Sequence, residues 1–221
     1  MRNPPLDLPA IVFDFDGTLA LLNIDFKEMR RDILDLAVSY RIPKDGLEQL
    51  FVLELITEIR HRIGADGSGR DDSFARQAMG LVTDRELTGA ANSLLFPGVR
   101  EMFRELRGRG IKTGILTRNC LEAVTVIFPD IRDYIDAVVT RDDTPRVKPD
   151  PEHIRVVLRR LNQDPSRSAM VGDHPMDISV GKEVGAFAIG VLTGYSSADD
   201  LKGAGADLIL ERAAEITSYL D

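Results

Sequence analysis

The sequence predicts an α/β protein, a doubly wound parallel sheet with an all-helical segment inserted near its start. The first observation is a short apolar run, Ile11-Val12-Phe13, which is typical of a buried strand. The second is a long stretch after it in which apolar residues recur only at helical spacing. The third is the alternation of strands and helices from Phe96 onward, the pattern of a parallel sheet with helices on both faces. We therefore expect a Rossmann-like α/β core domain over residues 1–20 and 96–221, and a helical insert over residues 21–95.

The composition limits the function before any motif is considered. The chain has 221 residues, of which 43% are hydrophobic, enough to bury a core of ordinary size. Its net charge of −8 argues against nucleic acid as a partner, because binding a phosphate backbone requires a basic face. No apolar run reaches the roughly 18 residues that a membrane span requires, so no membrane partner is expected.

Two further features concern location and assembly. The one cysteine, Cys120, excludes an intramolecular disulfide and suits a reducing compartment, so we expect a cytoplasmic protein. The stretch Met1–Ala10 is rich in proline and lacks an apolar run, unlike a secretory signal peptide. The sequence does not distinguish a monomer from a homodimer.

The insert is expected to consist of helices joined by short connections. Apolar residues recur every three or four positions over residues 26–40 and 45–60, and Pro43 and Asp45 are typical start residues for the second helix. The segment 64–69 is too rich in glycine for a helix and predicts a loop. Two shorter helices are expected after it, over residues 72–81 and 84–92.

In the core, strands and helices alternate to the end of the chain. Pro97-Gly98 precedes a helix from Val99 that Gly110 ends, and Pro151 is well placed for the first turn of a later helix. The expected strands cover residues 111–116, 137–139, 169–171, 186–191 and 207–210. The expected later helices cover residues 121–127, 152–161, 176–184, 198–201 and 213–220.

The first strand ends in two aspartates, Asp14 and Asp16, followed by Gly17 and Thr18. On an extended chain, residues two apart point to the same side, so the two carboxylates are expected to lie close together. Such a pair repels unless one carboxyl is protonated or a cation neutralises it. A metal-assisted reaction can use this arrangement, whereas the structural alternative is a strand that ends in an ordinary Asp-Gly turn.

Polar residues also follow two other strands and precede a later helix. Ligands bind at the carboxyl ends of the strands in open parallel sheets, so these residues are candidates for one common site. Each group has a purely structural alternative, as a helix cap, a helix N-terminal acid or a solvated loop charge. Their joint occurrence in this order favours a site composed of Thr117-Arg118-Asn119, Lys148 between two prolines, and Gly172-Asp173 with Asp177.

In these residues the chain resembles the haloacid dehalogenase superfamily, and within it the phosphatases that carry a helical cap. The resemblance covers nearly the whole chain, although the insert matches in position and helical character only. The closing Ala204-Gly205-Ala206-Asp207 is similar to the phosphoglycolate phosphatase branch. The motifs that carry the superfamily resemblance are Asp14-Phe15-Asp16-Gly17-Thr18-Leu19, Thr117, Lys148-Pro149-Asp150-Pro151 and Gly172-Asp173 with Asp177.

The resemblance implies a Mg²⁺-dependent phosphatase acting on a small phosphorylated metabolite. Asp14 would be the nucleophile that forms an aspartyl-phosphate, and Asp16 would be the general acid and then the general base. The second role requires a raised pKa for Asp16 in the closed site. Magnesium would be held by Asp14, the backbone carbonyl of Asp16 and Asp173, while Asp177 would act through a metal-bound water or through Lys148.

The resemblance also implies the residues that hold the phosphate. Lys148 would stabilise the transferring group and Thr117 would bind its oxygens, so both count as catalytic residues beside the two aspartates. Arg118 departs from the small polar residue that relatives often carry, and either contacts the substrate or points to solvent. The expected phosphate and substrate contacts are Gly17, Thr117, Arg118, Asn119 and Lys148.

Three alternatives remain open from the sequence. Dehalogenases lack an acid at the position of Asp16, so its presence favours phosphate transfer. A sugar phosphomutase of the β-phosphoglucomutase type shares the same core, and a non-catalytic phosphate-binding interaction protein would be expected to lose the key residues. Substrate choice is expected to depend on residues of the cap. The candidates are Arg60, His61, Arg62 and Arg70. The structural alternative for each of them is a solvated surface residue.

Overall fold

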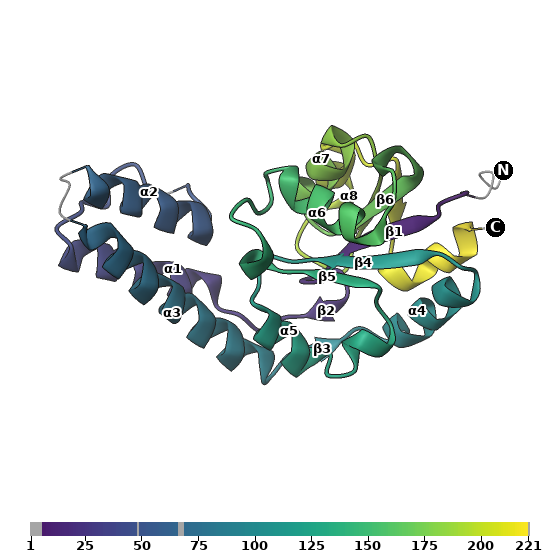
Figure 1. Cartoon of the computed structure of the whole chain (residues 1–221), viewed down its shortest axis with the longest axis horizontal. Coiled ribbons are helices and arrows are strands. Elements are labelled where there is room, and N and C mark those ends of the chain that lie inside the picture. The colour runs from purple at the N-terminus through teal and green to yellow at the C-terminus, as the bar shows by residue number, and fades with distance from the viewer. Residues whose placement is uncertain (1–5, 48, 66–68, 221) are drawn as a thin grey trace. The chain divides into compact units, whose positions relative to one another are not determined.

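The structure is a computed structural model that describes residues 6–47, 49–65 and 69–220 (Figure 1). The chain forms two compact units. The first, called here the core unit, comprises Met1–Leu22 and Ser93–Asp221. The second, called the helical unit, comprises Asn23–Asn92. Within the described residues, no helix combines the length and apolar character needed to cross a membrane.

The core unit contains a six-stranded parallel sheet in the order β5-β4-β1-β6-β7-β8. This topology confirms the predicted doubly wound sheet. The first strand lies in the middle, so the chain extends outward from it in both directions. The bounds are β1 Ala10–Asp14, β4 Lys112–Leu116, β5 Ala137–Val139, β6 Ser168–Gly172, β7 Phe187–Val191 and β8 Leu208–Leu210.

Helices cover both faces of this sheet (Figure 1). One face carries α6 Glu152–Leu161, α7 Pro175–Glu183 and α8 Ala198–Gly203. The opposite face carries α4 Val99–Gly108, α5 Leu121–Ile127 and the 3₁₀ helix η4 Ala213–Tyr219. Three further short 3₁₀ helices, which the sequence did not predict, are η1 Ile131–Asp133, η2 Arg141–Asp143 and η3 Pro165–Arg167.

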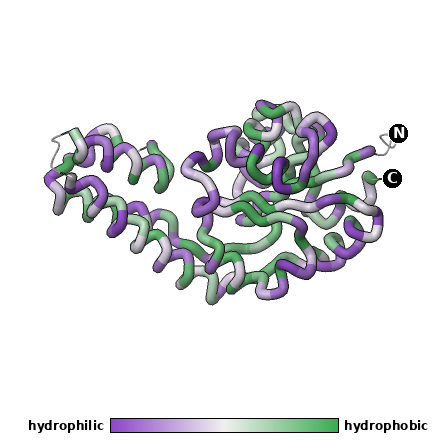
Figure 2. Tube along the Cα trace, in the orientation of Figure 1, coloured by the Kyte–Doolittle hydropathy of each residue, from purple (hydrophilic) through white to green (hydrophobic). Residues whose placement is uncertain are grey.

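The alternation of side chains along β1 decides which face each residue contacts. Ala10 and Val12 belong to the apolar cluster that includes the buried residues of α6. Phe13 points the other way and packs edge-on against Phe103 of α4, with ring centroids 5.2 Å apart. Two-residue periodicity therefore places Asp14 on the α6 side of the sheet. Figure 2 shows the largely hydrophobic traces of the central strands.

The helical unit consists of α1 Phe26–Ser39, α2 Val52–Gly64 and α3 Arg70–Ala90. Their apolar stripes form one shared cluster, with Met29 and Ile33 from α1, Leu55 and Ile59 from α2, and Phe74 from α3. The buried residues of each helix recur mostly every three or four positions, as expected of an amphipathic helix. A short antiparallel pair in the core unit, β2 Ala20–Leu21 and β3 Leu94–Leu95, flanks the helical segment in the sequence.

Two expectations for the helical unit were wrong. The helix predicted from residue 45 begins only at Val52. Gly46 has a φ of +74°, and the Arg30 guanidinium donates to the carbonyls of Leu47 and Leu50, which holds this segment outside a helix. The two helices predicted after residue 72 are one helix, α3, because no proline interrupts the sequence between them.

Smaller differences concern the ends of the core and the glycine loop. The final helix is a 3₁₀ helix rather than an α-helix. The two-residue strands β2 and β3 were not predicted, because runs this short carry no periodicity. Of the predicted loop over residues 64–69, positions 66–68 lie outside the described residues, while Gly64 ends α2 and Gly69 precedes α3.

Candidate active site

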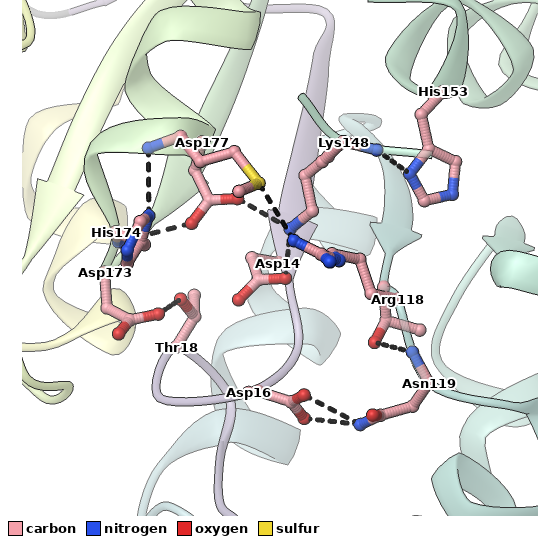
Figure 3. A network of polar contacts seen from close by, with 12 residues as sticks. Asp14, Asp16, Thr18, Arg118, Asn119, Lys148, His153, Asp173, His174 and Asp177 are labelled. Atoms are coloured by element: carbon pink, nitrogen blue, oxygen red, sulfur yellow. Dashed lines mark hydrogen bonds and ion pairs between the residues drawn. The ribbon is translucent and has the colours of Figure 1, made fainter. Parts of the chain in front are cut away.

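The candidate residues come together where three neighbouring strands end. Asp14 is the last residue of β1, which pairs with β4 on one side and β6 on the other. Thr117 follows β4 directly, and Asp173 follows β6. Lys148 comes from the segment between β5 and α6. Figure 3 shows Asp14, Lys148 and Asp177 pointing toward one another from these different elements.

Lys148 is the centre of a buried ionic network. Its Nζ lies 2.5 Å from Asp14 Oδ1 and 2.6 Å from Asp177 Oδ1, and its exposed fraction is only 4%. Burial alone would lower the pKa of Lys148, but the two carboxylates more than offset this and raise it above its ordinary value. The lysine is therefore a permanent, fixed cation at the end of β1.

One lysine does not balance the carboxylates around it. Burial raises the pKa of Asp14 well above its ordinary value, and Asp177, Asp173 and Asp16 add to this while Lys148 opposes it. Burial and then Asp177 raise the pKa of Asp173 to about 6. Both pKa values are raised for the same reason, because negative charge is in excess in a poorly solvated space.

This excess charge fits a divalent cation. Asp14, Asp173 and Asp177 each offer a carboxylate oxygen, and the three oxygens lie within 4.8 Å of one another. All three side chains are buried, and oxygen-only ligands suit a hard cation. The carboxylate of Asp16 is not part of this cluster. The resemblance assigned that residue a ligand role through its backbone carbonyl.

Glycine makes room for Asp173. Gly17 has a φ of +73°, and a Cβ at this position would lie 2.5 Å from Asp173 Oδ2. A Cβ at Gly194 would lie 1.7 Å from the same oxygen. Thr18 then donates its hydroxyl hydrogen to Asp173 Oδ1 at 3.2 Å. The space around this carboxylate is thus defined by two close glycines and one hydroxyl, which fix its direction.

Thr117 and Asn119 form a tight turn after β4. The backbone N–H of Thr117 donates to the carbonyl of Val139, and the Asn119 N–H donates to Thr117 Oγ1 at 3.1 Å. The Asn119 side chain donates through Nδ2 to both oxygens of Asp16, at 2.8 and 2.7 Å. Arg118 is half-buried, and its Nη1 donates to the sulfur of Met176 at 3.5 Å.

A neutral histidine, His153, contacts the backbone of Lys148. His153 is fully buried in α6, and its Nδ1 accepts a hydrogen bond from the backbone N–H of Lys148 at 3.1 Å. Burial, and then the charge of Lys148, lower the pKa of His153 to about 3. The imidazole therefore stays neutral and acts as an acceptor, which fixes the backbone next to the cation.

The start of α7 holds Asp177 in place. Asp177 Oδ2 accepts from the backbone N–H of His174 at 3.2 Å, while the His174 side chain accepts from Met176 N–H. These two bonds cap the helix from both directions. Asp177 Oδ1 is left to accept from Lys148, so the capping bond and the ionic bond use different oxygens.

The predicted cap residues belong to the helical unit. Arg60 pairs with Asp71 and Asp72, at 3.3 and 2.5 Å, and Arg62 pairs with Glu58 at 2.7 Å. An open hollow of about 460 Å³ is lined by residues from α2 and α3, among them Thr57, Arg60, His61 and Asp71. Arg70 is the first residue of α3.

Sequence reasoning assigned no role to four residues that hold the site together. Thr18 and Thr193 contact its loops, the latter by donating to the carbonyl of Gly17 at 2.5 Å. Applying the strand-end rule to β7 would have found Thr193 and Gly194, because they follow that strand closely. No sequence signal distinguishes His153 from an ordinary buried residue on the apolar face of α6.

The chain matches the family model of the haloacid dehalogenase-like hydrolases over residues 8–185. A phosphoglycolate phosphatase of Nitrosospira multiformis is 28% identical, and the match covers 98% of this chain and 97% of the relative. Pyrophosphatase PpaX of Bacillus velezensis is 36% identical, over 53% of this chain and 56% of that protein. A crystal structure of a hydrolase from Pseudomonas syringae has the same fold, with a TM-score of 0.70, 20% identity and coverage of 95% and 96% of the two chains.

Proposed function

The chain belongs to the haloacid dehalogenase-like hydrolases, and on this basis we propose that it is a phosphatase that hydrolyses a small phosphomonoester through an aspartyl-phosphate. The observation that carries the proposal is the buried contact of Lys148 with both Asp14 and Asp177 at the carboxyl end of the central strand. Burying a charged group this deeply lowers the stability of the fold. A site that binds an anionic substrate gives a reason for this burial.

We assign the chemistry to the core and substrate choice to the helical segment. The core domain, residues 1–20 and 96–221, contains every acidic and basic group of the proposed mechanism. The segment over residues 21–95 would act as the cap that selects the substrate. This division is supported by the difference in their buried residues, because the helical unit packs around an apolar cluster.

In the first step, an Asp14 carboxylate oxygen attacks phosphorus. The new bond joins that oxygen to phosphorus, while the bond from phosphorus to the leaving oxygen breaks. The leaving oxygen takes its proton from the carboxyl group of Asp16, so an alcohol departs rather than an alkoxide. Attack by an anion on an anion requires positive charge close by, and Lys148 Nζ supplies it at 2.5 Å from Asp14.

In the second step, water releases the phosphate. The water oxygen bonds to phosphorus, its proton goes to the Asp16 carboxylate, and the bond from phosphorus to Asp14 breaks. Both active-site aspartates are thereby restored. Asp16 acts as an acid in one step and a base in the next, so no further proton carrier is needed.

The phosphate oxygens would be bound at the end of β4 and beside β1. Thr117, Arg118, Lys148 and the backbone of Gly17 are the proposed contacts. Arg118 adds positive charge on the side of α7, where it contacts Met176. Asn119 was predicted as another contact, but its side-chain Nδ2 donates to both oxygens of Asp16.

The acidic cluster is the proposed site for Mg²⁺. Asp14 and Asp173 would hold the ion with the Asp16 backbone carbonyl, and Asp177 would support it while remaining paired with Lys148. When bound, the ion neutralises the excess carboxylate charge and polarises the phosphoryl oxygens. The raised pKa values of Asp14 and Asp173 support this assignment, because both carboxylates lack sufficient positive charge.

For the substrate we propose a small metabolite that resembles phosphoglycolate, with a second anionic group beside the phosphate. The support comes from the relatives, one named a phosphoglycolate phosphatase and one a pyrophosphatase. Both of those names denote substrates that carry more than one anionic group. The single cysteine is buried, which is consistent with the cytoplasmic location that we also propose.

The phosphomutase alternative is not favoured, because the similar curated proteins reported above are a phosphatase and a pyrophosphatase. A non-catalytic interaction protein is also disfavoured. Burying Lys148 between two carboxylates opposes folding, and a protein without the reaction would not need it.

The test is the release of inorganic phosphate across a panel of phosphorylated metabolites, with Mg²⁺ and with a chelator. We expect metal-dependent release, greatest for a phosphoester that bears a second anionic group. Conversion of a hexose 1-phosphate into its 6-phosphate without release of phosphate would instead identify a mutase. No turnover of any substrate, with the protein folded and Mg²⁺ present, would contradict the proposal.

A further inference from the structure

The proposed acid, Asp16, lies in the loop that follows the central strand β1. It follows β1 by two residues, and the backbone around it forms a turn in which Leu19 and Ala20 donate to the carbonyl of Phe15. Asp16 itself is only partly buried, unlike Asp14. A general acid must sit within hydrogen-bond reach of the oxygen that it protonates, so a freely rotating carboxyl would be inefficient.

One side chain reaches across from the neighbouring strand to hold it. Asn119 Nδ2 lies 2.8 Å from Asp16 Oδ1 and 2.7 Å from Asp16 Oδ2 (Figure 3). Contact with both oxygens fixes the rotation of the carboxyl group as well as its position. Asn119 is only 3% exposed, so solvent does not compete strongly for these bonds.

Asn119 is itself held from several directions. Its backbone N–H donates to Thr117 Oγ1, and its carbonyl accepts from the backbone N–H of Arg141 at 3.4 Å. The Arg141 side chain is 4% exposed, and its Nη1 donates to the carbonyl of Arg118 at 3.4 Å. Because these contacts hold Asn119 in place, its side chain can in turn fix the position of Asp16.

These contacts also argue against a phosphate-binding role for the same side chain. The amide group has one nitrogen that donates, and that nitrogen is directed at both Asp16 oxygens. The remaining polar atom is the amide oxygen, an acceptor that an anionic phosphate cannot use. Asn119 is therefore better placed to act on the proposed acid than on the phosphate.

We infer that Asn119 is a positioning residue that orients the Asp16 carboxyl toward the leaving oxygen of the substrate. The inference rests on the proposed function, because it assumes that Asp16 transfers the proton. The bond that Asn119 affects is the one between phosphorus and the leaving oxygen. Its contribution to the first step, formation of the aspartyl-phosphate, should matter only when that oxygen needs a proton as it departs.

The test compares two substrates that differ in this need. An alkyl phosphate releases a strongly basic alkoxide and requires the acid, whereas dinitrophenyl phosphate releases a weakly basic phenolate and does not. We expect Asn119→Ala to lower kcat/KM, which reports formation of the aspartyl-phosphate, about 100-fold for the alkyl phosphate and less than about threefold for the aryl phosphate. The later hydrolysis of the aspartyl-phosphate, in which Asp16 acts as the base, is common to both substrates and does not enter kcat/KM.

The ratio of the two rates makes the test robust. Both rates are measured on one preparation, so a partly unfolded variant lowers them equally and leaves the ratio unchanged. Asn119→Gln, which keeps an amide donor, should recover part of the alkyl phosphate rate. Thr125→Ala serves as a control with an unchanged ratio, because the Thr125 hydroxyl lies on the exposed side of α5 and donates to the backbone carbonyl of Glu122.

Asp16→Asn separates this inference from the proposed function. If Asp16→Asn and Asn119→Ala both lose the alkyl phosphate rate selectively, and the double variant loses little more, the inference is supported. Equal losses on both substrates for Asn119→Ala alone would overturn the inference and leave Asp16 as the acid. Equal losses for Asp16→Asn would overturn the assignment of Asp16, and the inference with it.

Discussion

The two units bury different kinds of residue. In the helical unit, α1, α2 and α3 pack around aliphatic and aromatic side chains, and Glu86 is the one buried charged residue there among the described positions. In the core unit, Asp14, Lys148, Asp173 and Asp177 are all buried together at the carboxyl edge of the sheet. Burying charge opposes folding, so it persists where it has a use.

Their ion pairs differ in the same way. Arg85 in the helical unit bonds Glu28 and Asp32 at 2.6 Å each, but all three side chains are substantially exposed. The pairs of Lys148 have similar lengths, 2.5 and 2.6 Å, and almost no exposure. Exposed pairs contribute little in water, whereas breaking a buried one leaves an uncompensated charge. The comparison predicts that equivalent substitutions have large effects in the core unit and small ones in the helical unit.

The largest effect is expected for Asp14→Asn. The amide has the shape of the carboxylate but cannot attack phosphorus, so kcat should fall at least about 10⁴-fold. The measurement is phosphate release from an aryl phosphate with Mg²⁺. Asp32→Asn in α1 is the matched control and should retain most of the activity. An equal loss in both variants would contradict the difference between the two units.

Lys148→Met should lower kcat/KM about 10²- to 10³-fold, because the developing charge on the transferring group loses its fixed cation. It should also lower the free energy of unfolding by about 3–5 kcal/mol, since Asp14 and Asp177 remain buried together. Urea denaturation measures the second effect. Lys182→Met, which breaks the exposed pair with Asp207 in the same unit, should cost less than about 1 kcal/mol.

Removing the metal should make stability depend on pH. The pKa of Asp173 is raised to about 6 from an ordinary 3.8, so its folded form favours the protonated carboxyl. Its contribution to stability is therefore complete below pH 3.8 and is lost as the pH rises through 6. In EDTA, this group should cost on the order of 2 kcal/mol between pH 4 and pH 7.5.

Mg²⁺ provides the check on that prediction. It should raise the thermal midpoint clearly at pH 7.5 and much less at pH 5, where protons already neutralise part of the cluster. Asp173→Asn should abolish both the pH-dependent loss and most of the stabilisation by Mg²⁺. A stabilisation that is the same at both pH values would place the ion outside this cluster.

The smallest effect is expected for Arg85→Met in the helical unit. Its guanidinium joins α1 to α3 through Glu28 and Asp32, but the pairs are exposed. We expect a slight decrease in the thermal midpoint and less than about a twofold change in turnover of an aryl phosphate. A loss as large as that of Lys148→Met would show that the two units are not distinguished by buried charge.

Much of the fold could be predicted because its determinants are local. Strands such as Phe187–Val191 are short apolar runs bounded by turn residues, and α5 has the predicted limits, Leu121–Ile127. The start of α2 could not be predicted in the same way. It depends on Arg30, more than fifteen residues away in the sequence, whose guanidinium binds the carbonyls ahead of that helix.

In the candidate site, too, some features could be predicted from the sequence and others could not. The rule that ligands bind at the carboxyl ends of parallel strands was enough to bring Asp14, Thr117 and Asp173 together from the sequence. The contacts that fix them were not predictable, because they depend on loop geometry. Neither the bond from Asn119 to Asp16 nor that from Lys148 N–H to His153 has a spacing that a sequence pattern records.

The central claim is that Asp14 carries the phosphoryl group during turnover. The most direct measurement is mass spectrometry of the protein after acid quenching during steady-state hydrolysis of an aryl phosphate with Mg²⁺. We predict that the peptide containing Asp14 gains the mass of one phosphoryl group, and that borohydride reduction before digestion converts residue 14 to homoserine. An actively hydrolysing enzyme with no phosphorylated peptide, or with the group on another residue, would contradict the account.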